Sequence, residues 1–204
     1  MNTPISRHLD GATLMSFAAG ALAEPLAAAV SAHVSMCGEC RDQVRDMALV
    51  GATLLGGALA PGGRVAAPVM PEAPVLAEAA ASPRRARARA LPAPIARRYG
   101  LAMEDIEWTR LGPGVWQHRL ALSPGARGDL YLLKLAPGCR LPLHGHAGDE
   151  LTVVLTGAFT DASGEYRVGD VQEADAGSEH QPMGDRNVGC ICLVAAEGPY
   201  ILKG

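Results

Sequence analysis

The stretch from Ala60 to Pro94 limits what this chain can fold into more than any other part of the sequence. Prolines recur in it at positions 61, 68, 71, 74, 83, 92 and 94, and Ala, Gly and Arg supply much of the remainder. Proline removes a backbone donor and clashes with the preceding turn, so no continuous helix can run through this stretch. We therefore expect a linker between two independent cores, with room for one short helix at Pro74–Ala81. The run Arg84–Arg89 is expected to be a solvated tether.

The residues before the linker have the spacing of helices. Leu14, Phe17 and Ala18 recur at intervals of three and four residues, which predicts an amphipathic helix. Pro25 fits the first turn of a second helix, where its missing N–H has no helical partner to lose. A third helix is expected to begin near Glu39. Much of the apolar content is alanine, which buries little area, so these helices predict a small compact domain over residues 1–60.

The residues after the linker have the pattern of short β-strands separated by Gly, Pro and Asp turns. The expected strands are Ile106–Arg110, Val115–Leu120, Leu130–Leu135, Leu151–Leu155, Tyr166–Val168, Val171–Glu173 and Val188–Val194. Many short strands at close spacing are typical of a β-sandwich or barrel. The predicted fold is therefore α+β and multidomain: a helical domain over 1–60, a linker over 61–94 and a β domain over 95–204.

A first candidate metal site lies in the helical segment, where His33, Cys37 and Cys40 form the pattern H-x3-C-x2-C. His33 and Cys37 are one helical turn apart and project on the same side, and Gly38 lets the chain turn so that Cys40 can face the same point. Two thiolates and one imidazole suit zinc, which prefers a closed tetrahedron of nitrogen and sulfur. A fourth ligand is needed, and His8 is the predicted one. The alternative is two buried cysteines and a hydrogen-bonded histidine.

A second candidate metal site lies in the β segment, where Gly138–Gly157 reads G-x5-H-x-H-x3-E-x6-G. His144 and His146 alternate along a strand and share a face, and Glu150 follows across a turn. His180 supplies a third imidazole after a further turn. Three imidazoles and one carboxylate suit a divalent first-row metal with open positions. The alternative is a pair of surface histidines in a turn.

These residues resemble two known patterns. Gly138–Gly157 is similar to the first cupin motif, and Gly169–His180 is similar to the second, although Asp175 stands where proline is usual and Gly184 where asparagine is usual. The His33, Cys37 and Cys40 pattern matches the signature of zinc-binding anti-sigma factors. In this order, and with the C-terminal pair Cys190 and Cys192, nearly the whole chain resembles the ChrR family of cupin-containing anti-sigma factors.

The resemblance implies a regulator that acts by binding protein. The helical domain is expected to bind an extracytoplasmic-function sigma factor and to cover the surfaces with which it engages core RNA polymerase, while zinc supports the helical fold. The cupin is expected to be needed for release of the sigma factor under singlet oxygen or related oxidants. A cytoplasmic location is expected, because Met1–Asp10 lacks the pattern of a signal peptide. No membrane partner is expected, and the net charge of −3 argues against direct nucleic-acid binding.

Five cysteines, an odd number, favour thiols or metal ligands over a disulfide framework. Cys190 and Cys192 alternate along a predicted strand, so both point into the barrel or both point out. The resemblance suggests that this pair has a sensing role. The alternative is that both are small apolar residues of the core with no function beyond packing. The same two roles are open for Cys139. His118 lies outside both patterns and is expected to be structural or exposed.

A metal-dependent cupin enzyme, a dioxygenase or an isomerase with a structural zinc appendage, is the alternative function. Fold alone cannot separate an enzyme from a regulator. Arg119, Arg140 and Arg167 are the cationic candidates for substrate binding on barrel strands. The helical zinc domain in front of the cupin favours the regulator. Zinc is the metal expected first in the cupin, although iron, manganese and nickel suit the same ligands.

Overall fold

A computed structural model describes residues 4–54 and 90–203 of the chain. Its helices are α1 (Gly11–Ala18), α2 (Glu24–Met36), α3 (Gly38–Leu54) and α4 (Ala93–Tyr99), followed by the short 3-10 helix η1 (Met103–Asp105). The first three confirm the helical segment. Asp10 begins α1 by accepting a hydrogen bond from the backbone N–H of Thr13 at 2.6 Å, as N-cap residues do. The short helix at Pro74–Ala81 and the run Arg84–Arg89 lie outside the described residues.

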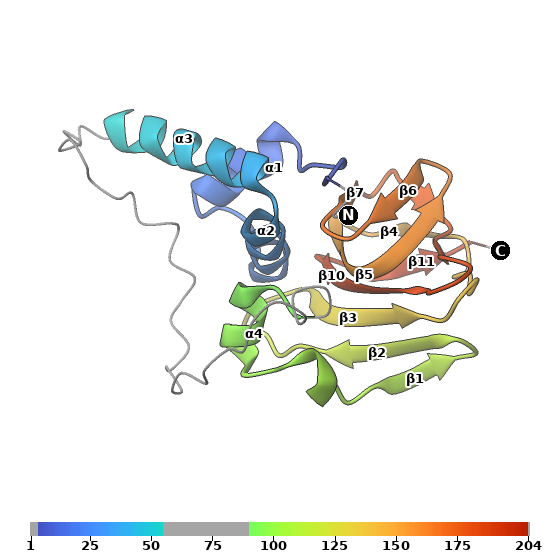
Figure 1. Cartoon of the computed structure of the whole chain (residues 1–204). Helices are drawn as coiled ribbons and strands as arrows, with labels where there is room; N and C mark the ends of the chain where they lie inside the picture. The colour runs from blue at the N-terminus through green and yellow to red at the C-terminus, as the bar shows by residue number, and fades with distance from the viewer. Residues whose placement is uncertain (1–3, 55–89, 204) are drawn as a thin grey trace.

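The strands form two antiparallel sheets (Figure 1). Their bounds are β1 (Thr109–Gly112), β2 (Val115–Arg119), β3 (Asp129–Leu135), β4 (His144–His146), β5 (Glu150–Asp161), β6 (Gly164–Arg167), β7 (Val171–Ala174), β8 (Glu179–His180), β9 (Met183–Gly184), β10 (Cys190–Ala196) and β11 (Tyr200–Leu202). The larger sheet has the order β1-β2-β3-β10-β5-β6, with β7 and β9 also paired to β5. The smaller sheet has the order β11-β4-β8. The predicted sandwich or barrel is therefore confirmed.

The structure contains four strands outside the predicted set, β4, β8, β9 and β11, and two predicted strands differ from it most. The strand expected over Ile106–Arg110 begins only at Thr109, because η1 precedes it and the Ile106 side chain is buried in the core. The strand expected over Leu151–Leu155 is the first part of the longer β5, which continues past Gly157 to pair with β6 and β9.

The helices and the larger sheet share one hydrophobic core. Helix α2 packs on β5 and β10, and Figure 1 shows it below α1 and α3 and above α4, beside the sheet. Leu14 and Val30 of the helices belong to the same buried cluster as Leu132, Val153 and Leu193 of the sheet. The expectation of two independent cores is therefore wrong. The alanines at 28, 29 and 32 of α2 are buried in the cluster that the helix shares with the sheet, where small side chains allow close packing.

Helix α4 spans the predicted boundary between the linker, which ends at residue 94, and the β domain, which begins at residue 95. It connects the helical half to the β half of the chain. It packs on α2, and its Arg98 forms an ion pair with Glu24 at the start of that helix. The backbone N–H of Ser123 donates to the same Glu24 carboxylate at 2.9 Å. No helix in the described parts of the chain is long and apolar enough to cross a bilayer.

Candidate metal centres

The N-terminal segment brings His8, His33, Cys37 and Cys40 together at the end of α2. One ligand atom from each lies within 4.8 Å of all the others. The His8 Nδ1 atom is 3.3 Å from the sulfur of Cys37 and 3.6 Å from that of Cys40, and the His33 Nε2 atom is 3.3 Å from the sulfur of Cys40. The arm of residues 4–10 that precedes α1 supplies His8, which is partly exposed, and the other three side chains are buried.

These separations fit a tetrahedral zinc ion. Zinc bonds of roughly 2.3 Å to sulfur and 2.0 Å to nitrogen place neighbouring sulfur and nitrogen ligands about 3.5 Å apart. The nitrogen–sulfur distances of 3.3, 3.3 and 3.6 Å bracket that value. The set of two thiols and two imidazoles is also one that zinc prefers over harder cations.

Burial keeps two side chains of this cluster, His33 and Cys40, neutral when no cation is present. It lowers the pKa of His33 to about 4, so the imidazole is unprotonated at neutral pH. It also raises the pKa of Cys40 to about 11, which favours the thiol. The Nδ1 atom of His33 lies 2.9 Å from the carbonyl oxygen of Gly169, so Nδ1 donates to that oxygen and Nε2 is free to bind a metal. A bound cation would stabilise the Cys40 thiolate that burial disfavours.

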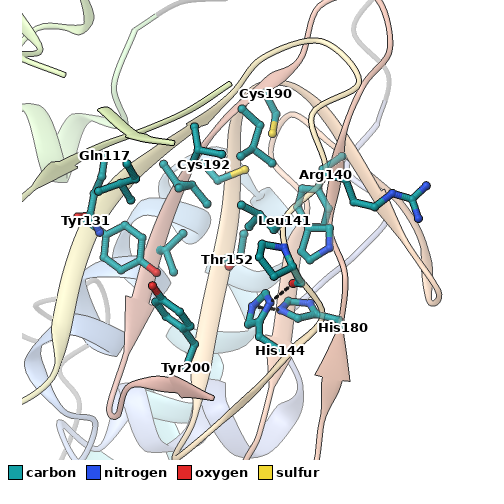
Figure 2. A pocket seen from close by; sticks show the side chains of 18 of the residues that line it. Gln117, Tyr131, Arg140, Leu141, His144, Thr152, His180, Cys190, Cys192 and Tyr200 are labelled. Atoms are coloured by element: carbon teal, nitrogen blue, oxygen red, sulfur yellow. Dashed lines mark hydrogen bonds between the residues drawn. The ribbon is translucent and has the colours of Figure 1, made fainter. Parts of the chain in front are cut away.

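The β domain brings His144, His146 and His180 together between β4 and β8. The Nε2 atom of His180 lies 3.0 Å from that of His144 and 3.2 Å from that of His146. Strand pairing explains the meeting, because His144 and His180 are opposite each other in the β4–β8 ladder. Figure 2 shows the rings of His144 and His180 side by side at one end of a cavity.

The outer nitrogen of each imidazole faces an oxygen. Nδ1 of His144 is 2.9 Å from the carbonyl oxygen of Pro142, and Nδ1 of His180 is 3.3 Å from a carboxylate oxygen of Asp161. Nδ1 of His146 is 3.5 Å from a carboxylate oxygen of Glu150. The Pro142 carbonyl accepts a hydrogen bond from Nδ1 of His144, which leaves the Nε2 lone pair of that ring directed into the cluster. The Nε2 atoms of the other two rings converge on the same point. Converging lone pairs repel one another, and a divalent cation between them removes the repulsion.

Glu150 is not brought into this cluster in the structure. Its carboxylate contacts the outer nitrogen of His146 and accepts a hydrogen bond from the Thr152 hydroxyl at 3.3 Å. Burial raises the pKa of Glu150 to about 7 and lowers the pKa of His180 to about 4, the latter with help from the neighbouring histidines. A nearby cation would favour the ionised form of Glu150. Its predicted role as a fourth ligand stays a prediction.

A cavity of about 630 Å³ extends from His144 and His180 into the barrel. Its lining is mostly apolar and includes side chains from both sheets, among them Leu133 and Val194 of the larger sheet and Leu202 of the smaller. A pocket of this size with polar groups at one end can hold a small molecule next to the histidines.

Cys190 and Cys192 both point into the barrel, which decides between the two orientations that the sequence left open (Figure 2). Both are buried free thiols, and the hydrogen bond from Cys190, followed by burial, raises the pKa of Cys192. Cys190 and Cys192 belong to a second buried cluster, apart from the core shared with the helices. Cys139 packs against this second cluster as a free thiol, and burial raises its pKa. His118 lies apart from both clusters, with Nδ1 at 2.9 Å from the carbonyl oxygen of Glu107, in keeping with a structural role.

Of the predicted cationic residues, Arg119 and Arg140 line the cavity and Arg167 does not. Arg119 pairs with Asp129 and Arg167 with Glu165, while Arg140 points away from the cavity interior in Figure 2. This set gives the cavity no converging cationic groups of the kind that would bind an anionic substrate.

Sequence analysis missed the carboxylates behind the two clusters. Asp161 contacts His180, and Asp170 lies fully buried beside Gly169 in the turn before β7. The only sequence signal for Asp170 is its position in a Gly-Asp turn between two short predicted strands, and that signal does not reveal burial. Asp161 carries no signal, because its contact depends on β5 being longer than the sequence indicated.

Comparison with known proteins places these features in a class. The β domain and its histidine cluster define a cupin, joined here to a helical domain with a His/Cys cluster. Residues 96–200 match the family model of the ChrR cupin-like domain. The anti-sigma-E factor ChrR of Cereibacter sphaeroides is 39% identical over 197 residues, which are 96% of this chain and 91% of that protein.

The crystal structure of Rhodobacter sphaeroides SigE in complex with the anti-sigma ChrR extends the likeness to three dimensions. Its matched chain is 35% identical, has a TM-score of 0.74 and aligns over 94% of this chain and 99% of its own length. This chain belongs to the ChrR family of anti-sigma factors. It is therefore a regulator of transcription and not a cupin enzyme.

Proposed function

We propose that this chain binds and inhibits an extracytoplasmic-function sigma factor through its helical half, and releases it when the cupin half responds to an oxidant. The observation that carries the first part is a structural alignment: 94% of this chain aligns with a chain in the crystal structure of a SigE–ChrR complex. Since sigma factors act on RNA polymerase, the proposed location is the cytoplasm. The proposed division is a helical domain over 1–60, a linker over 61–94 and a cupin over 95–204, with α4 docked on the helices.

The metals are part of the proposal. Zinc would be held by His8, His33, Cys37 and Cys40, whose nitrogen–sulfur distances match its bond lengths. A divalent cation, zinc before iron, manganese or nickel, would be held by His144, His146 and His180 with Glu150 beside them. The second ion would supply an open coordination position next to the cavity.

Oxidant sensing rests on the chemistry around that cavity. Imidazoles at one end and the free thiols of Cys190 and Cys192 along its wall are oxidisable groups that a small reactive molecule could reach together. A change there can release the sigma factor only if it alters the free-energy difference between the bound and released states. The shared core gives such a change a physical path to the helices.

Copurification tests the binding proposal directly. We expect the full chain, expressed with an affinity tag in its own host, to retain one sigma factor in a stoichiometric complex that mass spectrometry identifies. The matched control is Cys37→Ser, which removes one proposed zinc ligand and should lose the partner. Wild-type protein that recovers no sigma factor would contradict the proposal.

A further inference from the structure

The turn between β6 and β7, Arg167–Val171, supports the His/Cys cluster from the β side. The carbonyl oxygen of Gly169 accepts the Nδ1 hydrogen of His33 at 2.9 Å. A hydrogen bond to the outer nitrogen of a metal-binding histidine fixes both its tautomer and the orientation of its ring. His33 is fully buried, so few other groups can set that orientation.

The same turn holds the arm that carries His8. Asp170 is 1% exposed, and its Oδ1 atom accepts the backbone N–H groups of Ser6 at 2.7 Å and Arg7 at 3.0 Å. Its Oδ2 atom accepts the N–H of Arg167 at 2.8 Å within the turn itself. The N–H of Val171 in turn donates to the carbonyl oxygen of Arg7 at 3.3 Å. The residue next along the arm is His8, so its backbone position depends on these bonds.

The backbone conformation of the turn favours glycine at position 169. Gly169 has a φ of +92°, in the region that L side chains rarely adopt. A Cβ atom placed on it would lie 2.6 Å from the Ile5 side chain. The arm therefore rests directly on the turn.

Further contacts join the arm to the turn before β6, to β6 itself and to β7. The guanidinium of Arg7 donates to the carbonyl oxygen of Ser163 at 2.9 Å and lies 5.2 Å from the centre of the Tyr166 ring. The N–H of Asp10 donates to the carboxylate of Glu173 at 2.8 Å. Figure 1 shows the start of the chain beside β7.

Strand β7 also reaches the support of the second cluster. The Gln172 side-chain amide donates to Asp161 at 2.5 Å, and the same Asp161 oxygen lies 3.3 Å from Nδ1 of His180. Gln172 is two residues from Asp170, so one short segment contacts groups behind both clusters.

We propose that the β6–β7 turn is a positioning element of the N-terminal metal site, in which Asp170 holds the arm of His8 and Gly169 orients His33. Two of the four ligands are then set by the β domain, and the site is complete only while that domain is docked on the helices. By linkage, a change that loosens the turn weakens metal binding in the helical half. This inference rests on the proposed zinc site of the helical half.

The test uses the full zinc-loaded chain with Asp170→Asn. This substitution keeps the size of the side chain but replaces one of its two acceptor oxygens by an NH2 group, so the three N–H groups can no longer all be bound. Zinc release to a chromophoric chelator should be about 10- to 100-fold faster from the N-terminal site, the range found when supports behind a ligand are lost. Hydrogen exchange at the Ser6 and Arg7 amides should rise. The cupin metal should be retained, a pattern that general destabilisation would not give.

The matched control is Asp185→Asn, because Asp185 also accepts two backbone N–H groups in a turn, from Asn187 at 2.8 Å and Val188 at 3.0 Å. It should release zinc at the wild-type rate. Ser6→Pro is the second variant: it removes one donor to Asp170 and leaves the bond inside the turn intact, so faster release is expected here too.

Wild-type release rates in both Asp170→Asn and Ser6→Pro overturn the inference and leave the proposed function standing, provided that Cys37→Ser loses zinc. Full zinc content in Cys37→Ser shows that the N-terminal site itself is wrong, and it overturns the inference together with that part of the proposed function.

Discussion

Cys37 and Cys40 place two thiols within contact of two imidazoles, an arrangement that has little stability of its own. Burial raises the pKa of Cys40 to about 11 and lowers that of His33 to about 4, so neither side chain is charged at neutral pH without a cation. In a helical half this small, metal binding contributes directly to folding.

Cys37→Ser should therefore release the N-terminal zinc and loosen the helical half. Loss of a direct ligand should weaken zinc binding by more than about 100-fold, since loss of an outer support costs about 10- to 100-fold. Elemental analysis should find about one metal fewer per chain, and circular dichroism should show less helix. Cys139→Ser removes a thiol outside both clusters and is the control. Equal metal content in the two variants would argue against a zinc role for Cys37.

At the scale of elements, the ion pair between Glu24 of α2 and Arg98 of α4 docks the second half of the chain on the first. Both side chains are mostly buried, at 16% and 15% exposure. Removing one partner of such a pair leaves the other charge poorly solvated.

Glu24→Ala should destabilise the protein by about 1 to 3 kcal/mol, because Arg98 and the Ser123 N–H lose their acceptor. Urea unfolding followed by fluorescence measures the change. Glu165→Ala is the matched control, since its pair with Arg167 is largely exposed and should contribute less than about 1 kcal/mol. Equal effects of the two substitutions would show that the α2–α4 pair does not dock the helix.

The elements also show which parts of the structure could be predicted from sequence. Local spacing was sufficient where the signal is local: His33, Cys37 and Cys40 lie on neighbouring turns, and His144 and His146 alternate on one strand. The meeting of His180 with His144 followed from the cupin pattern, and the β4–β8 ladder provides it.

Long-range contacts were not predictable. The buried position of Asp170 depends on an arm more than 160 residues away in the sequence, and no periodicity records that contact. The orientation of Glu150 depends on which neighbour its carboxylate contacts, which spacing along the chain does not specify. The shared core was missed because alanines on α2 were interpreted as filling a small helical domain, whereas they are buried in a cluster that also contains residues of the sheet.

For the whole molecule, the core shared by the helical half and the β half couples the stabilities of the two halves. Val30 on α2 and Leu193 on β10 are both fully buried in the same cluster. Separating the halves would expose this apolar surface, so neither half should unfold without loss to the other.

Unfolding of the described halves should therefore be one cooperative transition. The helical signal in far-ultraviolet circular dichroism and the aromatic signal of the β domain, which contains Trp108 and Trp116, should coincide in urea. Leu193→Ala should shift both signals together, by about 2 to 5 kcal/mol. Two transitions separated in urea concentration would show that the halves are independent despite their contact.

The central claim is that the cupin cluster controls release of the sigma factor held by the helical half. The most direct measurement follows the purified complex with the copurified sigma factor by fluorescence anisotropy while a photosensitiser generates singlet oxygen. The wild-type complex should dissociate, and the His144→Ala complex should form with the same affinity but stay intact under the same illumination. Equal dissociation of the two complexes would contradict the account, because the cupin cluster would then have no part in release.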